Sequence, residues 1–289
     1  MRLVTAILVV AALALPAAAQ KKQELGWPLD MDGDIRIHNY NGAVTLIAWD
    51  RDSVAVTAVV AGDVRPFGGG RRRGVKLGVE SPGGGTAPLA DFTVYVPARA
   101  RVSIRGAATA IDVRGLSGTI DASTLGGRIR VAGPTTEVIV ETMDGDVDVE
   151  ASPTYLRART ASGRITWTGA SDDVSLTTVS GIVVVRTGTL YRARIESITG
   201  DLRFTGTVKP DGRVTFDSHA GDITLDLSSG TEADVTVDAP KGTVLQRDYE
   251  RSPGKGAAVF SLPRLSLGKS HPAVIVARSF KGRVFVTQP

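Results

Sequence analysis

The chain has 289 residues, with 34 Lys and Arg against 30 Asp and Glu, and it contains no cysteine. This near balance of charge gives no reason to expect a nucleic-acid partner, and the lack of cysteine excludes disulfides and a lipid-modified N-terminal cysteine. Thirty-three glycines, few aromatic residues and many Val, Ile and Thr residues indicate a β-rich chain with many turns.

Residues 1–19 predict a cleaved secretory signal peptide. A basic start at Arg2 precedes an apolar run from Leu3 to Leu15, and the alanines before Gln20 match the small-residue cleavage pattern. The run is too short to span a bilayer comfortably and no second long run follows, so we expect no integral membrane segment after the signal is removed. The protein is therefore expected to be exported, as a periplasmic, cell-surface or secreted protein.

Residues 20–106 are expected to form an N-terminal β cap that includes a glycine-rich loop. Residues 33–60 alternate apolar and polar positions as in three strands, with Asn41 and Gly42 predicting a tight turn. The glycine-rich stretch 61–90 predicts a long loop.

Three consecutive arginines lie within this predicted loop, in "GGGRRRG". No helix follows them, so the stretch fits neither a P-loop nor a dinucleotide fingerprint. Arg71, Arg72 and Arg73 are candidate binding residues for an electrostatic contact, and a solvated basic loop is the simpler alternative.

Residues 107–245 repeat with a period of 18–21 residues, which is the strongest feature of the sequence. "STLGGRIRV", "ETMDGDVDV", "RTASGRITW", "TTVSGIVVV", "ESITGDLRF" and "DSHAGDITL" align on Gly127, Gly145, Gly163, Gly181, Gly200 and Gly221. Shorter alternating segments such as "TEVIV" lie between them, so each coil is expected to hold two short strands and two turns. The alternation excludes helical repeats, and the period is too short for a propeller blade.

Columns of similar residues run through the aligned repeats. The second and fourth residues after each glycine are apolar, which predicts that they point inward. The residue three before each glycine is Thr or Ser, which we expect to hydrogen-bond the turn or the next coil. Each glycine is expected to take a backbone conformation closed to other residues.

These patterns predict an all-β fold, a single-chain parallel β-solenoid (β-helix) with two short strands per coil. Seven coils about 4.8 Å apart would make a rod of roughly 34 Å. Irregular β segments are expected to cap both ends, and residues 246–289 are expected to form a loop and closing strands.

The acid-rich stretch "DGDVDVE" resembles a calcium loop or a catalytic pair, but stacking predicts a charge-paired face. Asp146 is expected between Arg128 and Arg164, and Asp148 beside Arg130. The spacing also fits no calcium-binding template.

No nucleophile motif or metal-ligand spacing is present, and the three histidines are far apart in the sequence. We therefore expect no catalytic residue, no metal site and no cofactor.

One coil departs from the polar outer columns. Ile182 and Val184 occupy outward positions where neighbouring coils carry Asp, Arg or Thr. An exposed apolar pair is a candidate contact site. The alternative is that a loop, 61–90 or 246–257, folds over the pair.

The chain resembles the bacterial putative adhesin family of exported repeat proteins. The resemblance rests on "GDIRIHNYNGAVTLIAWDRDSVAVTA", on "YVPARARVSI" and on the succession "SGRITW", "SGIVVV", "TGDLRF" and "AGDITL", and it covers most of residues 30–250. That family has no agreed catalytic residues, so none is carried over.

We therefore expect a non-enzymatic, adhesin-like protein of the cell envelope that binds an envelope protein or a surface glycan through the side of the solenoid. The alternatives are a carbohydrate-active β-helix enzyme, a polysaccharide lyase or hydrolase with acids or bases in a loop-framed groove, and a purely structural spacer. The sequence leaves the partner, the handedness of the solenoid and the oligomeric state open.

Overall fold

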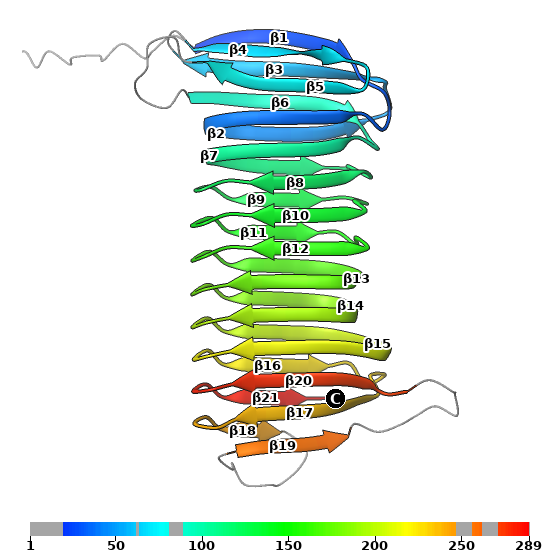
Figure 1. The fold of residues 1–289 in the computed structure, drawn as a ribbon, viewed down its shortest axis with the longest axis vertical. Helices are drawn as coiled ribbons and strands as arrows, with labels where there is room; N and C mark the ends of the chain where they lie inside the picture. The colour runs from blue at the N-terminus through cyan, green and yellow to red at the C-terminus, as the bar shows by residue number, and fades with distance from the viewer. Residues whose placement is uncertain (1–19, 62–63, 81–88, 247–255, 262–270, 289) are drawn as a thin grey trace, which may run out of the picture.

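The computed structural model describes residues 20–61, 64–80, 89–246, 256–261 and 271–288, which form 21 β-strands and contain no helix. The strands stack along one axis into a rod, with β1 (Gln20–Pro28) at one end and β19 (Gly256–Ser261) at the other (Figure 1). The all-β, solenoid-like fold predicted from the sequence is confirmed at this level.

Parallel pairing between coils builds the first part of the body. Seven strands pair in a closed ring: β7 (Arg101–Arg114), β8 (Thr119–Ser123), β9 (Ile129–Ala132), β10 (Glu137–Glu141), β11 (Val147–Glu150), β12 (Tyr155–Arg159) and β13 (Ile165–Thr178). β8, β10 and β12 form one side, β9 and β11 form the other, and β7 and β13 extend over both sides.

Beyond β12 the two sides of a coil run into one continuous strand. β13, β14 (Val183–Ser197) and β15 (Leu202–Ser218) each turn the corner without a break in the strand. The expected division into two short strands does not hold for these coils. The earlier corners contain Pro134 and Pro153, which lack a backbone N–H, whereas the corners of β13 and β14 contain no proline. Pro210 of β15 lies in a gap in that strand's pairing with β14, between Val208 and Arg213.

The columns predicted from the repeats lie in register. Val147 pairs with Ile129 on one side and Ile165 on the other. The predicted inward residues are buried, including Trp167 and Phe204. This confirms that the period-2 pattern forms the core between the two sides.

The hydroxyl column is buried and hydrogen-bonded as expected. The Thr142 hydroxyl accepts from the Gly145 N–H at 3.1 Å, and the Thr160 hydroxyl of the next coil donates to the Gly145 carbonyl at 3.1 Å. The same arrangement recurs at Ser218 and Ser279. Each hydroxyl therefore fixes its own turn, and several also join two coils.

The glycine column exists because the coils approach closely. A Cβ at Gly163 would lie 1.9 Å from the Gly145 carbonyl oxygen, and one at Gly181 would lie 1.8 Å from that of Gly163. Within this column only Gly127 has a positive φ, of 114°. The expectation of a special backbone conformation is wrong for the others, where contact with the neighbouring backbone excludes a side chain.

The last coils are not stacked in chain order. The strands here are β16 (Ile223–Leu227), β17 (Ala233–Ala239), β18 (Val244–Gln246), β20 (Ala273–Ser279) and β21 (Val284–Thr287). β20 pairs with both β15 and β17, and β21 pairs with both β16 and β18 (Figure 1).

The C-terminal strands therefore lie between two coils that follow each other in sequence, and they do not simply close the end. They fit because Ser279 and Gly282 repeat the hydroxyl and glycine of the turn. β19 pairs antiparallel with β17 and lies beyond it.

The N-terminal cap continues the two sides of the rod. It contains β2 (Asp34–Trp49), β3 (Ser53–Ala61), β4 (Arg65–Arg71), β5 (Gly74–Glu80) and β6 (Leu89–Pro97). β2 pairs in parallel with β7 along both sides, so the turn predicted at Asn41 and Gly42 is a corner within one strand, with φ 110° at Gly42, and residues 33–60 form two strands where three were expected. β3 and β1 follow β6 as antiparallel neighbours.

The glycine-rich stretch forms the antiparallel hairpin β4–β5, so the long-loop prediction is wrong for residues 65–80. Aromatic rings cover the glycines. A Cβ at Gly68 would lie 2.2 Å from the Trp27 ring, and one at Gly78 would lie 2.8 Å from the Phe67 ring. Glycine in a strand is expected where another group approaches this closely.

Replacing Gly163 with Ala is expected to destabilise the rod by about 1–3 kcal/mol, because the Cβ meets a backbone oxygen that cannot move without separating two coils. Gly126→Ala is the matched control, since nothing lies within 4 Å of its Cβ position. Urea unfolding of both variants checks this. Equal shifts of the two midpoints would contradict the close-contact explanation.

Acid is expected to weaken the junction between β2 and β7. Asp34 accepts from the Arg101 Nε at 2.8 Å and from its Nη2 at 3.2 Å, and this hydrogen bonding lowers the pKa of Asp34. A lowered folded-state pKa adds stability that is present above about pH 4, the ordinary range of an unfolded Asp, and is lost as pH falls through the lowered value. Asp34→Asn should therefore flatten the acid limb of the profile of stability against pH, measured by urea unfolding of the variant and the unaltered chain at a series of pH values; an unchanged acid limb would contradict this role of the Asp34–Arg101 pair.

Candidate functional site

One corner of the rod carries a line of apolar side chains, one from each coil. The residue two before each glycine occupies this line, and the large ones are about half exposed: Leu125 59%, Met143 54%, Val179 48% and Ile198 51%. They are four of the seven exposed large apolar side chains in the described chain. We call the full series the apolar ladder: Leu125, Met143, Ala161, Val179, Ile198, His219 and Phe280.

The turn itself orients the ladder. The Thr or Ser that precedes each ladder residue is buried and holds the glycine N–H, so the next side chain faces solvent. The backbone N–H of Met143 donates to the Leu125 carbonyl at 3.2 Å, and that of Ile198 donates to the Val179 carbonyl at 3.1 Å. Successive ladder residues are therefore about 4.8 Å apart, and the seven of them extend over roughly 29 Å.

Aromatic rings occupy the C-terminal end of the ladder. His219 and Phe280 stack with their centroids 5.1 Å apart, and the Lys241 ammonium lies 4.9 Å from the Phe280 centroid. A hollow of about 230 Å³ adjoins these rings, and its lining is Asp217, Ser218, His219, Asp238, Pro240, Arg278 and Phe280. The ladder thus ends in a small concave site with both acidic and basic groups.

The acidic stretch 144–150 forms a charge-paired outer face, but its pairs are diagonal. Asp148 lies opposite Arg130 in the predicted register. Its carboxylate nevertheless accepts from the Arg128 Nε at 2.6 Å, and the Arg130 side chain bonds Glu150 at 3.0 Å. Arginine is long enough to reach a diagonal neighbour across two strands. Asp146 accepts from the backbone N–H of Arg164 at 2.8 Å, not from its side chain.

The predicted contact residues Ile182 and Val184 are half-buried: Ile182 directly precedes β14 and Val184 lies within it. Val184 stacks between Thr166 and Arg203. The pair widens the apolar surface beside the ladder at this coil. The described part of 61–90 forms β4 and β5 at the other end of the rod, so it does not cover them, and residues 81–88 and 247–255 lie outside the described chain.

The three arginines lie at the turn of the β4–β5 hairpin, far from Ile182 and Val184 along the rod (Figure 1). Arg72 bonds Asp30 at 2.9 Å and Asp52 at 2.8 Å, and the bond to Asp30 contributes most to raising its pKa. Arg73 reaches Asp30 at 4.0 Å, whereas Arg71 is simply exposed. Arg72 therefore has a structural role in holding this turn against the chain after β1.

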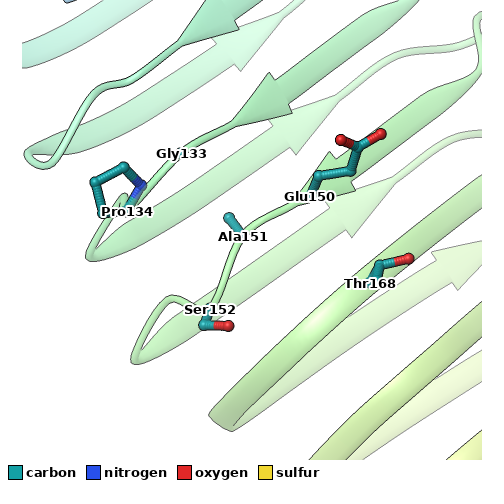
Figure 2. A pocket seen from close by; sticks show the side chains of 6 residues that line it. All are labelled: Gly133, Pro134, Glu150, Ala151, Ser152 and Thr168. Atoms are coloured by element: carbon teal, nitrogen blue, oxygen red, sulfur yellow. The ribbon is translucent and has the colours of Figure 1, made fainter.

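A second hollow of about 570 Å³ lies at the opposite corner of the rod, where one side of a coil joins the other. Figure 2 shows its lining: Gly133, Pro134, Glu150, Ala151, Ser152 and Thr168. Two of its polar side chains already have partners: Glu150 bonds Arg130, and the Ser152 hydroxyl accepts from the Ala170 N–H. The hollow is broadly open and mostly apolar, so it offers little to fix a ligand.

Two further searches cover only the ranges that the structure describes. No group of three His, Asp or Glu side chains is placed to hold a metal ion there. No helix long and apolar enough to cross a membrane is found in the same ranges.

We did not predict the apolar ladder from the sequence. Its signal was present in the aligned turns, where Leu, Met, Ala, Val and Ile follow the Thr or Ser in successive repeats. Turn positions are normally polar, so an apolar residue that recurs in a turn indicates a surface feature.

Several solved structures have a similar chain trace. A putative lipid binding protein from Parabacteroides distasonis gives a TM-score of 0.54 at 11% identity, over 92% of this chain and 96% of that one. Putative adhesins from Parabacteroides distasonis and Bacteroides fragilis give TM-scores of 0.43 and 0.44 at 12% and 8% identity, each over 93% of this chain and 97% of theirs. At such identities the likeness extends to the fold alone, and no curated protein gives a significant match.

The sequence profile of one family matches more than half of the chain. The match covers residues 88–252, which include the body of the rod and the ladder from Leu125 to His219. The chain therefore belongs to the Toastrack DUF4097 family.

Proposed function

We propose that this protein is an exported, non-enzymatic, adhesin-like scaffold of the cell envelope, and that its rod presents the apolar ladder to a partner. The exposed fractions of Leu125, Met143, Val179 and Ile198 carry this proposal. Lines of exposed apolar side chains are unfavourable in water and mark contact surfaces. Export rests on the signal sequence in residues 1–19.

The framework that we propose for residues 107–245 is a parallel β-solenoid in which a coil of 18–21 residues supplies two sides. Such a rod holds its turns rigidly, because each turn bonds the one before it. A rigid surface loses little conformational entropy when it binds. Ile182 and Val184 extend the contact onto one side of the rod, and Arg71 and Arg73 remain candidates for a separate electrostatic contact at its N-terminal end.

The arrangement favours binding over catalysis. Glycoside-cleaving enzymes need an acid pair or a free base in a groove. In the larger hollow the Glu150 carboxylate already bonds Arg130. In the smaller hollow Asp217 and Asp238 lie beside Arg278, and its lining residues include no long loop that would frame a groove. A structural spacer needs no exposed apolar ladder, so the ladder also favours a binding role.

Exchange of the central ladder residues is expected to weaken partner binding. The mature chain and a Val179→Ser/Ile198→Ser variant would be used as baits in envelope extract. The captured protein or glycan would then be purified and its Kd measured against both. Loss of the apolar contacts should weaken binding at least about tenfold. An Ile182→Asp/Val184→Asp variant tests the flank in the same assay.

Tyr40→Ser/Leu89→Ser is the matched control, because these side chains are 52% and 43% exposed but lie outside the ladder. It should bind like the unaltered chain. A purified partner whose Kd is the same for the ladder variant and the control would contradict the proposal.

A further inference from the structure

Charged residues flank the apolar ladder in bands. Each rung consists of a ladder residue with the exposed or half-exposed residues on either side of it. In spatial order from Met143 to Phe280, the six rungs are acidic, basic, uncharged, acidic, acidic and basic. Their flanking residues are Glu141, Asp144 and Asp146 at Met143; Arg159 and Arg164 at Ala161; Thr177, Ser180 and Ile182 at Val179; Glu196 and Asp201 at Ile198; Asp217 and Asp222 at His219; and Arg278, Lys281 and Arg283 at Phe280.

This order is complementary to itself when reversed. Two copies that meet ladder to ladder, antiparallel, with a two-fold axis midway between Val179 and Ile198, bring the Met143 rung onto Phe280 and the Ala161 rung onto His219. Because such an axis keeps each flank on its own side, the charged residues of the Met143 and Ala161 rungs face opposite charges, while Glu196 and Asp201 of the Ile198 rung face the uncharged Val179 rung. The facing pairs are Glu141 with Arg278, Asp144 with Lys281, Asp146 with Arg283, Arg159 with Asp217 and Arg164 with Asp222.

Other arrangements of two copies bring like charges together. A parallel two-fold places each rung on itself, so acidic rungs meet acidic and basic rungs meet basic. Moving the antiparallel axis to the Val179 rung places the acidic Met143 rung on the acidic His219 rung. Moving it to the Ile198 rung places the basic Ala161 rung on the basic Phe280 rung. Like charges across an interface are unfavourable, so the charges select one register.

Several of these charges have no ion pair within the described chain. Glu141, Arg159, Asp217 and Arg278 form no salt bridge with another described residue. The exceptions are Asp222 and Arg283, which bond each other at 2.6 Å between neighbouring rungs. The unpaired charges therefore lie where a second copy supplies their partners.

The apolar residues fit the same register. Ala161, the smallest ladder residue, faces the His219 ring, and Val179 faces Ile198 at the axis. Met143 faces Phe280, a pairing of thioether and aromatic ring that is favourable. The hollow of about 230 Å³ beside Phe280 contains Arg278, which lies opposite Glu141 of the second copy.

We propose that the ladder binds a second copy of this chain, antiparallel, about this two-fold axis. The proposal rests on the proposed function, since it names the partner of the same ladder. Six rungs about 4.8 Å apart give a contact of roughly 24 Å in length. The surface area buried in so narrow a contact falls below the ~1,200 Å² that stable complexes bury, so the dimer should be weak. It should also dissociate at high salt, because salt screens the charged bands.

Charge exchange between two variants tests the register. Arg159→Asp places like acids opposite Asp217 of the second copy, and Asp217→Arg places like bases there. Sedimentation equilibrium of the mature chain at low salt should show a dimer that each variant weakens at least about tenfold. An equimolar mixture of the two variants should regain association close to that of the unaltered chain, because the mixed dimer restores opposite charges at both places.

Arg213→Asp is the control, since Arg213 is exposed in β15 away from the ladder and should leave the dimer unchanged. Two results would overturn the proposal: a mature chain that stays monomeric in low salt at about 100 µM, or a mixture of the two variants that associates no more tightly than either variant alone. If the chain stays monomeric while a captured partner still depends on Val179 and Ile198, this inference fails and the proposed function stands. If the dimer forms but no other partner needs the ladder, binding is confined to the second copy.

Discussion

The close contact between successive glycine turns is the constraint on which the rest of the structure depends. From Gly145 onward, each turn places a glycine where a Cβ would lie 1.7–2.1 Å from the glycine carbonyl of the neighbouring coil. The contact holds the coils in a single register, so every strand meets its counterpart one repeat away. A chain without cysteine has no covalent cross-link to do this, and the hydroxyl column reinforces the contact from inside the turn.

The same turn gives the rod its surface chemistry. With the hydroxyl inside and the glycine backbone against its neighbour, the residue between them faces solvent. Repetition then converts one exposed side chain into a line at the spacing of the coils, and it converts single charges into bands. A contact surface on such a rod is therefore long and narrow, and specificity depends on the order of the rungs more than on any one of them.

The two ends show how a repeat stack is completed. At the C-terminal end, β20 and β21 lie between coils that are consecutive in the chain, and β19 pairs antiparallel beyond β17. At the N-terminal end, the β4–β5 hairpin and β1 extend the two sides under the cover of Trp27 and Phe67. Both ends replace parallel stacking with antiparallel strands, which can follow short connections.

The sequence by itself determined the all-β class, the repeat and the inward columns, because alternation and the period of the turn are local properties that each repeat carries in full. Only the tertiary structure decided the position of β20, the hairpin in the glycine-rich stretch and the diagonal partner of Asp148. Each depends on residues far apart in the chain. The ladder lies between these cases. Its residues can be identified in the turns of the sequence, but their exposure and their order beside the charged bands followed only from the stacking of the coils.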